Sequence, residues 1–180
     1  MKKNIYIVLS HTGTFPAKVI RWITHGKYSH VSLCLEDDFK VLYSFGRIHP
    51  YNPFHGGYVK ESPDFGTFKR FRNTEVRILR IRAEESCYDA MKSYLEKMYE
   101  ERDHYKYNYR GLFLAIFNKQ FRRKDHFFCS EFVSETLDRF RVVDEPFFDK
   151  LVKPMDLFSL PDSDVIYTGK LSVFSESGNS

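Results

Sequence analysis

The sequence predicts one α+β domain over residues 1–180, in which a central antiparallel sheet packs against helices. Short stretches in which apolar and polar residues alternate are typical of half-buried strands, and they dominate the first half of the chain. Longer stretches with apolar residues every three or four positions are typical of helices and dominate the second half. No repeat and no internal linker divides the chain, whose length suits a single domain.

The N-terminal part predicts strands and one helix. The apolar run Asn4–Ser10 predicts a first strand, and Pro16 predicts the first turn of a helix that ends near Thr24. Ser29–Glu36 alternates strictly, as expected of a half-buried strand. A turn at Asp37-Asp38 and a second apolar run, about Lys40–Gly46, complete a predicted hairpin.

The rest of the chain begins with a turn-rich, aromatic segment, Arg47–Gly66, which contains three Pro and three Gly. It predicts a long loop, and long loops in compact domains are usually functional or disordered. The elements expected after it are strands over Thr67–Arg72 and Glu75–Arg82, helices over Glu84–Arg102 and Arg110–Phe121, a helix that begins at Cys129, a short segment around Pro146–Leu151, a helical turn in PMDLFSLP and one or two strands within Asp164–Phe174.

Composition excludes several classes of protein. The net charge of +4 and the absence of a nucleic-acid-binding motif predict no nucleic-acid partner. Three widely spaced cysteines predict neither a disulfide framework nor a zinc site, so we expect no metal and no cofactor. The first apolar run is too short for a signal peptide, and no segment approaches the roughly 20 apolar residues of a membrane helix. A cytoplasmic protein is expected; membrane association is not favoured but is left open.

Cys129 stands at the predicted start of an amphipathic helix, in the stretch HFFCSEFVSETLDRF. The unpaired N–H groups and the dipole of a helix N-terminus stabilise a thiolate, which is the nucleophilic form of cysteine. Most free cysteines are simply small buried side chains, so position alone does not decide between catalysis and packing. Cys34 lies on a predicted strand and Cys87 on the inner stripe of a predicted helix.

A thiol nucleophile needs a base, usually histidine, held by a third polar group. Of the seven histidines, His30 is the best candidate because it lies at the start of a strand, on the polar face of an otherwise apolar segment. Cys34 shares that face but stands roughly 13 Å along the same strand, too far for contact. A buried histidine with purely structural hydrogen bonds is the alternative interpretation.

The segments YSHVSLCLEDDFKVLYSFGR and FFCSEFVSETL resemble the circularly permuted papain-like cysteine hydrolases and amidases of the NlpC type. In that group a histidine on a strand precedes the cysteine that begins a long helix, as His30 precedes Cys129. The segment KPMDLFSLP resembles the Pro-x-Asp-Leu segment that often follows in such proteins. The resemblance implies a permuted papain-like fold, with Cys129 as nucleophile and His30 as base.

The third polar residue departs from the family pattern. Many members carry Glu, Gln or His on the strand after the histidine strand, where this chain has Ser44. A serine can exchange a hydrogen bond with an imidazole but cannot stabilise an imidazolium as a carboxylate does. Tyr28, Tyr51 and Tyr58 are expected to line the substrate cleft, the last two from the Arg47–Gly66 loop.

The function that follows is a cysteine amidase or peptidase acting on a small peptide or amino-acid amide, including cell-wall peptide fragments. Because Ser44 replaces an acidic residue, a non-catalytic module that binds an amino acid or peptide on the same scaffold remains an alternative. A lipid acyltransferase of the lecithin:retinol acyltransferase type shares the His-before-Cys order. Members of that type usually carry a second histidine about a dozen residues after the first, and position 42 here is Leu.

Overall fold

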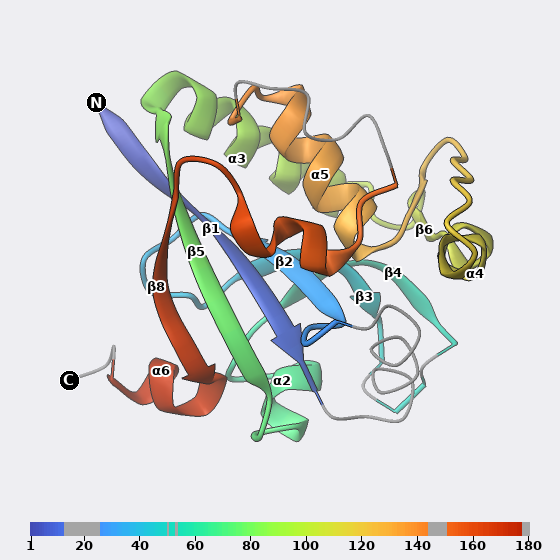
Figure 1. Ribbon diagram of the computed structural model, residues 1–180, viewed down its shortest axis with the longest axis horizontal. Helices are drawn as coiled ribbons and strands as arrows, with labels where there is room; N and C mark the ends of the chain where they lie inside the picture. Colours follow the sequence, from blue (N-terminus) through green and yellow to red (C-terminus); the bar gives the residue numbers. More distant parts are fainter. Residues whose placement is uncertain (13–25, 50, 53, 144–150, 178–180) are drawn as a thin grey trace.

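A computed structural model describes residues 1–12, 26–49, 51–52, 54–143 and 151–177. The strands are β1 (Lys2–His11), β2 (His30–Cys34), β3 (Leu42–Arg47), β4 (Gly56–Glu61), β5 (Glu75–Glu84), β6 (Lys106–Tyr107), β7 (His126–Phe127) and β8 (Ser163–Lys170). The helices are α2 (Gly66–Arg70), α3 (Glu85–Glu100), α4 (Tyr109–Ile116), α5 (Cys129–Arg139), the 3-10 helix η1 (Pro154–Ser159) and α6 (Leu171–Ser177). The predicted mixed α+β architecture is confirmed (Figure 1).

The strands form one eight-stranded sheet in the order β7-β6-β4-β3-β2-β1-β5-β8. Neighbouring strands are antiparallel except β6 and β7, which are parallel. The central strand β1 is buried on both faces, which explains its nearly continuous apolar sequence. Its Ile5, Ile7 and Leu9 belong to the larger of two apolar clusters, and Tyr6 and Val8 to the smaller.

Helices cover both faces of the sheet. The larger cluster joins the sheet to α3, α5 and η1, and the smaller one joins it to α2 and α6 (Figure 1). Helix α3 buries a stripe of Tyr88, Met91, Leu95 and Met98, with the three- and four-residue spacing of one helix face. Helix α5 packs against β2 and β3, so its N-terminus is held beside the start of β2.

The hairpin of β2 and β3 is confirmed, with Leu33 opposite Tyr43. The predicted long loop is wrong in its second half, because Gly56–Glu61 forms β4 and pairs with β3. Gly56 and Gly57 conceal the strand pattern in the sequence, yet β4 requires a small residue here. A side-chain carbon at Gly56 would lie 2.9 Å from ring atoms of Tyr107 and 2.9 Å from the Tyr109 hydroxyl.

Two further elements differ from expectation. The predicted strand over Thr67–Arg72 is a helical turn, α2, because the three-residue spacing of Phe68 and Phe71 suits one turn, and only Phe68 is fully buried. The C-terminal segment forms β8 and then α6, rather than strands alone. The predicted helix after Pro16 and most of the segment around Pro146 lie outside the described residues.

Candidate functional site

His30 opens β2 and faces a carboxylate. Its Nε2 lies 2.9 Å from Oε2 of Glu61, the last residue of β4, and the two side chains are 19% and 9% exposed. Strand β3 lies between β2 and β4, so the contact crosses it. Gly46 of β3 makes this contact feasible, because a side-chain carbon there would stand 3.2 Å from Oε1 of Glu61 and 3.6 Å from Cε1 of His30.

Two buried serines complete the hydrogen bonding around this pair. Ser32, two residues after His30 on the same strand, donates to Oε2 of Glu61 at 2.9 Å. The hydroxyl of Ser44 lies 3.1 Å from Nε2 of His30. The structure therefore brings Ser44 to the imidazole, and it adds a carboxylate that the sequence interpretation did not consider. Ser44 acts beside Glu61 here, and the carboxylate is the group able to stabilise an imidazolium.

Cys129 is the first residue of α5 and is 4% exposed. The residues that follow it fix the start of the helix. The backbone N–H of Phe128 donates to Oε2 of Glu131, one half of a capping box, at 3.4 Å. Ser130 donates to the carbonyl of Val152 at 2.7 Å and ties the helix to the segment before η1. Phe132 packs in the core. The residues that follow Cys129 in the Cys-Ser-Glu-Phe sequence thus hold the thiol at the first position of α5.

The side chains of His30, Cys129 and Glu61 act on one another electrostatically. Burial alone would lower the pKa of His30, but the negative charge of Glu61 and hydrogen bonds with Cys129 and Glu61 raise it to about 10. Burial would raise the pKa of Glu61, and the positive charge and hydrogen bond of His30 hold that pKa below its usual value. At neutral pH the pair is therefore an imidazolium and a carboxylate. Cys129 interacts with the same imidazole through a hydrogen bond.

We expect His30 to remain protonated well above the usual histidine pKa of about 6.5. In ¹H–¹³C NMR spectra its ring signals should keep imidazolium shifts at pH 8, because Glu61 stabilises the charged form. In Glu61→Gln the same signals should titrate at lower pH than in the wild type, since burial is then opposed by Cys129 alone. His30 signals that show a neutral ring at pH 8 in the wild-type protein would contradict the ion pair.

The ion pair also makes stability depend on pH. Because the pKa of His30 is raised, its contribution is complete below about pH 6.5 and is lost as pH rises towards 10. Because the pKa of Glu61 is lowered, its contribution is present above the ordinary carboxyl pKa and is lost as pH falls. The pair therefore stabilises the fold most in weakly acidic solution, between those limits.

The three tyrosines expected at the cleft do not gather around His30. Tyr28 is buried against Phe158, with ring centroids 6.2 Å apart. Tyr58 is buried and donates to the carbonyl of Leu95. Tyr51 is 80% exposed, and the guanidinium of Arg70 lies over its ring. Two therefore lie in the core and one on the surface, and a ligand-binding role for them stays a prediction.

Tyr107 is a neighbour of the site that the sequence did not reveal. Strand β6 pairs with β7, which places Tyr107 opposite Phe127, two residues before Cys129. Burial and the charge of Cys129 both raise the pKa of Tyr107 well above its usual value. The sequence does not distinguish Tyr107 from the other tyrosines, because a two-residue strand has no periodicity to detect.

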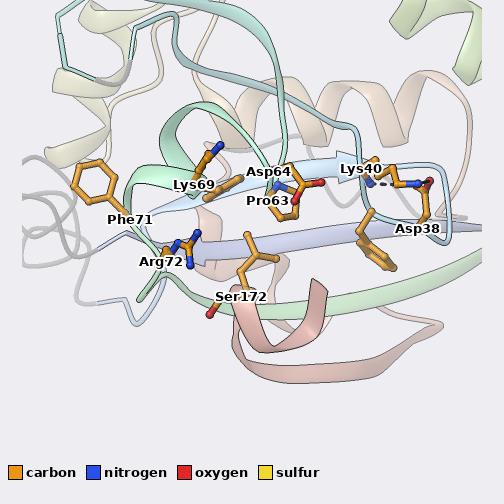
Figure 2. A pocket seen from close by; sticks show the side chains of 11 residues that line it. Asp38, Lys40, Pro63, Asp64, Lys69, Phe71, Arg72 and Ser172 are labelled. Carbon is orange, nitrogen blue, oxygen red and sulfur yellow. Dashed lines mark hydrogen bonds and ion pairs between the residues drawn. The ribbon is translucent and has the colours of Figure 1, made fainter. Parts of the chain in front are cut away.

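A separate cavity of about 340 Å³ lies on the sheet face that α2 and α6 cover (Figure 2). Its lining includes Phe39, Phe68 and Leu171, with charged residues of both signs: Asp38, Lys40, Asp64, Lys69 and Arg72. Neither His30, Glu61 nor Cys129 belongs to it. The cavity is thus distinct from the candidate site.

The described residues lack the features of two other classes of site. No three or more His, Cys, Asp or Glu side chains there are grouped as a metal ion would need. No helix in the same part of the chain is long and apolar enough to cross a membrane.

Comparisons with known proteins supply no relative. No protein-family model matches the chain, and searches of curated proteins and of solved structures found no significant similarity.

Proposed function

We propose that the chain is a cysteine hydrolase in which Cys129 is the nucleophile, His30 the base and Glu61 the residue that orients and charges the base. The observation that carries the proposal is the 2.9 Å contact of His30 with the buried carboxylate of Glu61, on an imidazole whose pKa a hydrogen bond with Cys129 also raises. These are the three roles that thiol catalysis requires. Two of the residues were candidates from the sequence, and the third fills the role left to Ser44.

The resemblance to permuted papain-like enzymes of the NlpC type supports the same proposal. His30 on β2 precedes Cys129 on α5, and the helix packs against the strands that carry the histidine. We propose that the sheet with α5 is a permuted papain-like fold. The substrate proposed is a small peptide or amino-acid amide, with cell-wall peptide fragments included.

The chemistry follows from which nitrogen is free. Glu61 holds Nε2 of His30, so Nδ1 is the nitrogen that would carry the proton given up by the thiol, and the reacting pair is a thiolate beside the imidazolium described above. Sγ of Cys129 then attacks the carbonyl carbon and forms a C–S bond. The tetrahedral intermediate breaks the C–N bond, and the amine leaves with the proton from His30. Water, deprotonated by His30, attacks the thioester and releases the acid and the thiolate.

The oxyanion of the intermediate needs donors of its own. The first N–H groups of a helix have no intrahelical acceptor, and the backbone N–H of Cys129 is one of them in α5. This group is the natural donor for an oxygen on the carbon that Sγ attacks. The capping by Glu131 keeps the helix start in position.

Glu61 weakens the case for a non-catalytic binding module. That alternative was favoured because a serine stood where a carboxylate was expected. A carboxylate is present after all, from a different strand, and it is 9% exposed and paired with His30. A module that only bound peptides would not need a thiol in contact with a charged imidazole.

Acyl transfer at a lipid surface is the second candidate. A thioester can be attacked by an acceptor other than water, and the same three residues would serve. The observation that favours it is that Tyr109, Phe113 and Phe117, on and next to α4, expose their aromatic rings close to the site.

Trapping the acyl-enzyme tests the proposed chemistry. The protein is mixed with a panel of activated esters and amides of amino acids, short peptides and fatty acids, quenched in acid and measured by intact mass and peptide mapping. We expect an adduct on Cys129, absent in Cys129→Ala and retained in the matched control Cys87→Ala. Adducts distributed over all three cysteines, or none with any substrate class, would reject the proposal.

A further inference from the structure

Four aromatic side chains recur at every fourth position from Tyr109 to Phe121, along and just beyond helix α4. Their exposed fractions are large: 42% for Tyr109, 60% for Phe113, 59% for Phe117 and 36% for Phe121. Such a periodic apolar stripe normally faces a protein core. Here the opposite side of the helix, which includes Gly111 and Ala115, is the buried one.

The helix is held firmly in this orientation. The side chain of Asn108 caps it by accepting from the N–H of Gly111 at 2.9 Å, and it donates to the carbonyl of Phe121 at 2.9 Å and to Oε2 of Glu131 at 3.2 Å. A side-chain carbon at Gly111 would collide with Asn108 at 2.3 Å. The aromatic face is therefore presented outward by buried contacts.

The charges along this segment of the sequence have one sign. Residues 105–124 contain six basic residues and no acidic one, although the whole chain has a net charge of only +4. The basic residues are Lys106, Arg110, Lys119, Arg122, Arg123 and Lys124. Arg110, Lys119, Arg123 and Lys124 are exposed, on or just beyond the same helix. An exposed aromatic face bordered by cations is typical of helices that lie in the interface of an anionic membrane.

We propose that the basic–aromatic surface, residues 109–124, docks the protein on anionic lipid membranes. The helix has eight residues and is about 12 Å long, so it would lie in the headgroup region and not span the bilayer. Aromatic rings enter the interfacial region readily, and the cations pair with lipid headgroups. In Figure 1, α4 stands at one side of the molecule, beyond β6 and β4.

This surface adjoins the candidate site. Tyr109 packs on Tyr107, with ring centroids 4.7 Å apart, and Asn108 bonds to Glu131, two residues after Cys129. Docking through α4 would hold the start of α5 near the lipid headgroups. The docking itself does not depend on the proposed catalysis, because none of the three catalytic side chains belongs to the surface.

Vesicle binding tests the proposal. The full chain is sedimented with phosphatidylcholine vesicles and with vesicles containing phosphatidylserine or phosphatidylglycerol. We expect binding to the anionic vesicles that falls as salt is raised. The double variant Phe113→Ser/Phe117→Ser should weaken vesicle binding about 10- to 100-fold, because it removes the two rings that enter the membrane in the docked state. Arg123→Gln/Lys124→Gln should weaken it by about 30-fold.

Matched controls separate the surface from general charge and hydrophobicity. Phe65→Ser removes an aromatic side chain that is 52% exposed and lies outside this surface. Lys69→Gln/Arg72→Gln removes one lysine and one arginine charge from the lining of the cavity beside α2 and α6. Both should bind vesicles like the wild type, as should Cys129→Ala. Equal loss in controls and surface variants would overturn the proposal.

Three other results would also overturn it. They are equal binding to neutral and anionic vesicles, no binding to either, and a change of oligomeric state in Phe113→Ser/Phe117→Ser with unchanged sedimentation. The last would show that a second copy of the chain covers the face.

Discussion

Removing Cys129 or His30 is expected to abolish most of the proposed activity, and removing both should cost no more than removing one. Each single alanine variant should lower kcat/KM by about 10⁴- to 10⁶-fold, because neither group of a nucleophile–base pair works without the other. The double variant should therefore lie at the same residual rate. The measurement is kcat/KM for the best substrate found by acyl-enzyme trapping.

The control for these single and double variants is Cys87→Ala, which removes a thiol outside the site and should keep full activity. Because His30→Ala leaves the carboxylate of Glu61 buried without its partner, its fold must be checked by circular dichroism and thermal unfolding. His30→Gln keeps a hydrogen-bond donor for Glu61 and should be equally inactive. Losses that add in the double variant would mean that the two residues act independently.

Glu61→Gln is expected to lower kcat/KM by about 10²- to 10⁴-fold with little change in shape. The amide can still contact Nε2 of His30, but it carries no charge to stabilise the imidazolium and can leave the ring in the wrong tautomer. The pH dependence of the residual activity should shift as well, because the pKa of His30 is no longer raised by Glu61.

A matched control for Glu61 is Glu96→Gln. Glu96 is also a paired carboxylate, bound to Lys60 at 2.7 Å on the face of the sheet that α3 covers, but it does not touch His30. We expect it to retain activity within a few-fold of the wild type. If Glu61→Gln behaves like Glu96→Gln, the carboxylate is structural and Ser44 alone would hold the imidazole.

The thiol and the imidazole could be proposed from the sequence because local patterns identify them. The alternation of β2 puts His30 on the polar face of an apolar strand, and the helical stripe after Cys129 puts the thiol at a helix start. Both inferences need only the chain within a few residues of the candidate. In the structure a hydrogen bond with Cys129 is one cause of the raised pKa of His30, so the two side chains are neighbours.

Glu61 was out of reach for a physical reason. It ends a strand whose first two residues are glycines, so the segment has the composition of a loop, and it meets His30 only because β3 places a glycine between them. Pairing between strands is a tertiary property that periodicity does not contain.

The exposed face of α4 could not be predicted from the sequence. The sequence predicts a helix over Arg110–Phe121, and the structure has one over Tyr109–Ile116 that ends five residues earlier. The usual inference from an aromatic residue at every fourth position is that the aromatic side packs inward. The burial of Gly111 and Ala115 on the other side reverses that orientation. Only the packing of the whole chain can decide which side of such a helix meets solvent.

The order in which the three cysteines react with iodoacetamide tests the central claim most directly. Cys87 is the most exposed of the three cysteines, since Cys34 and Cys129 are both buried. Burial also raises the pKa of Cys34, to about 12, and that of Cys87. Reactivity governed by access would therefore label Cys87 first, whereas reactivity governed by an imidazolium beside the sulfur would label Cys129 first.

We predict that brief exposure of the folded protein near pH 6.5, read by peptide mass mapping, labels Cys129 ahead of the other two. His30→Gln and Glu61→Gln should both slow this labelling, and unfolding in denaturant should remove the difference between the three thiols. If Cys87 reacts first in the wild-type protein and neither variant changes the rate at Cys129, then Cys129 is a buried structural thiol and the hydrolase proposal is wrong.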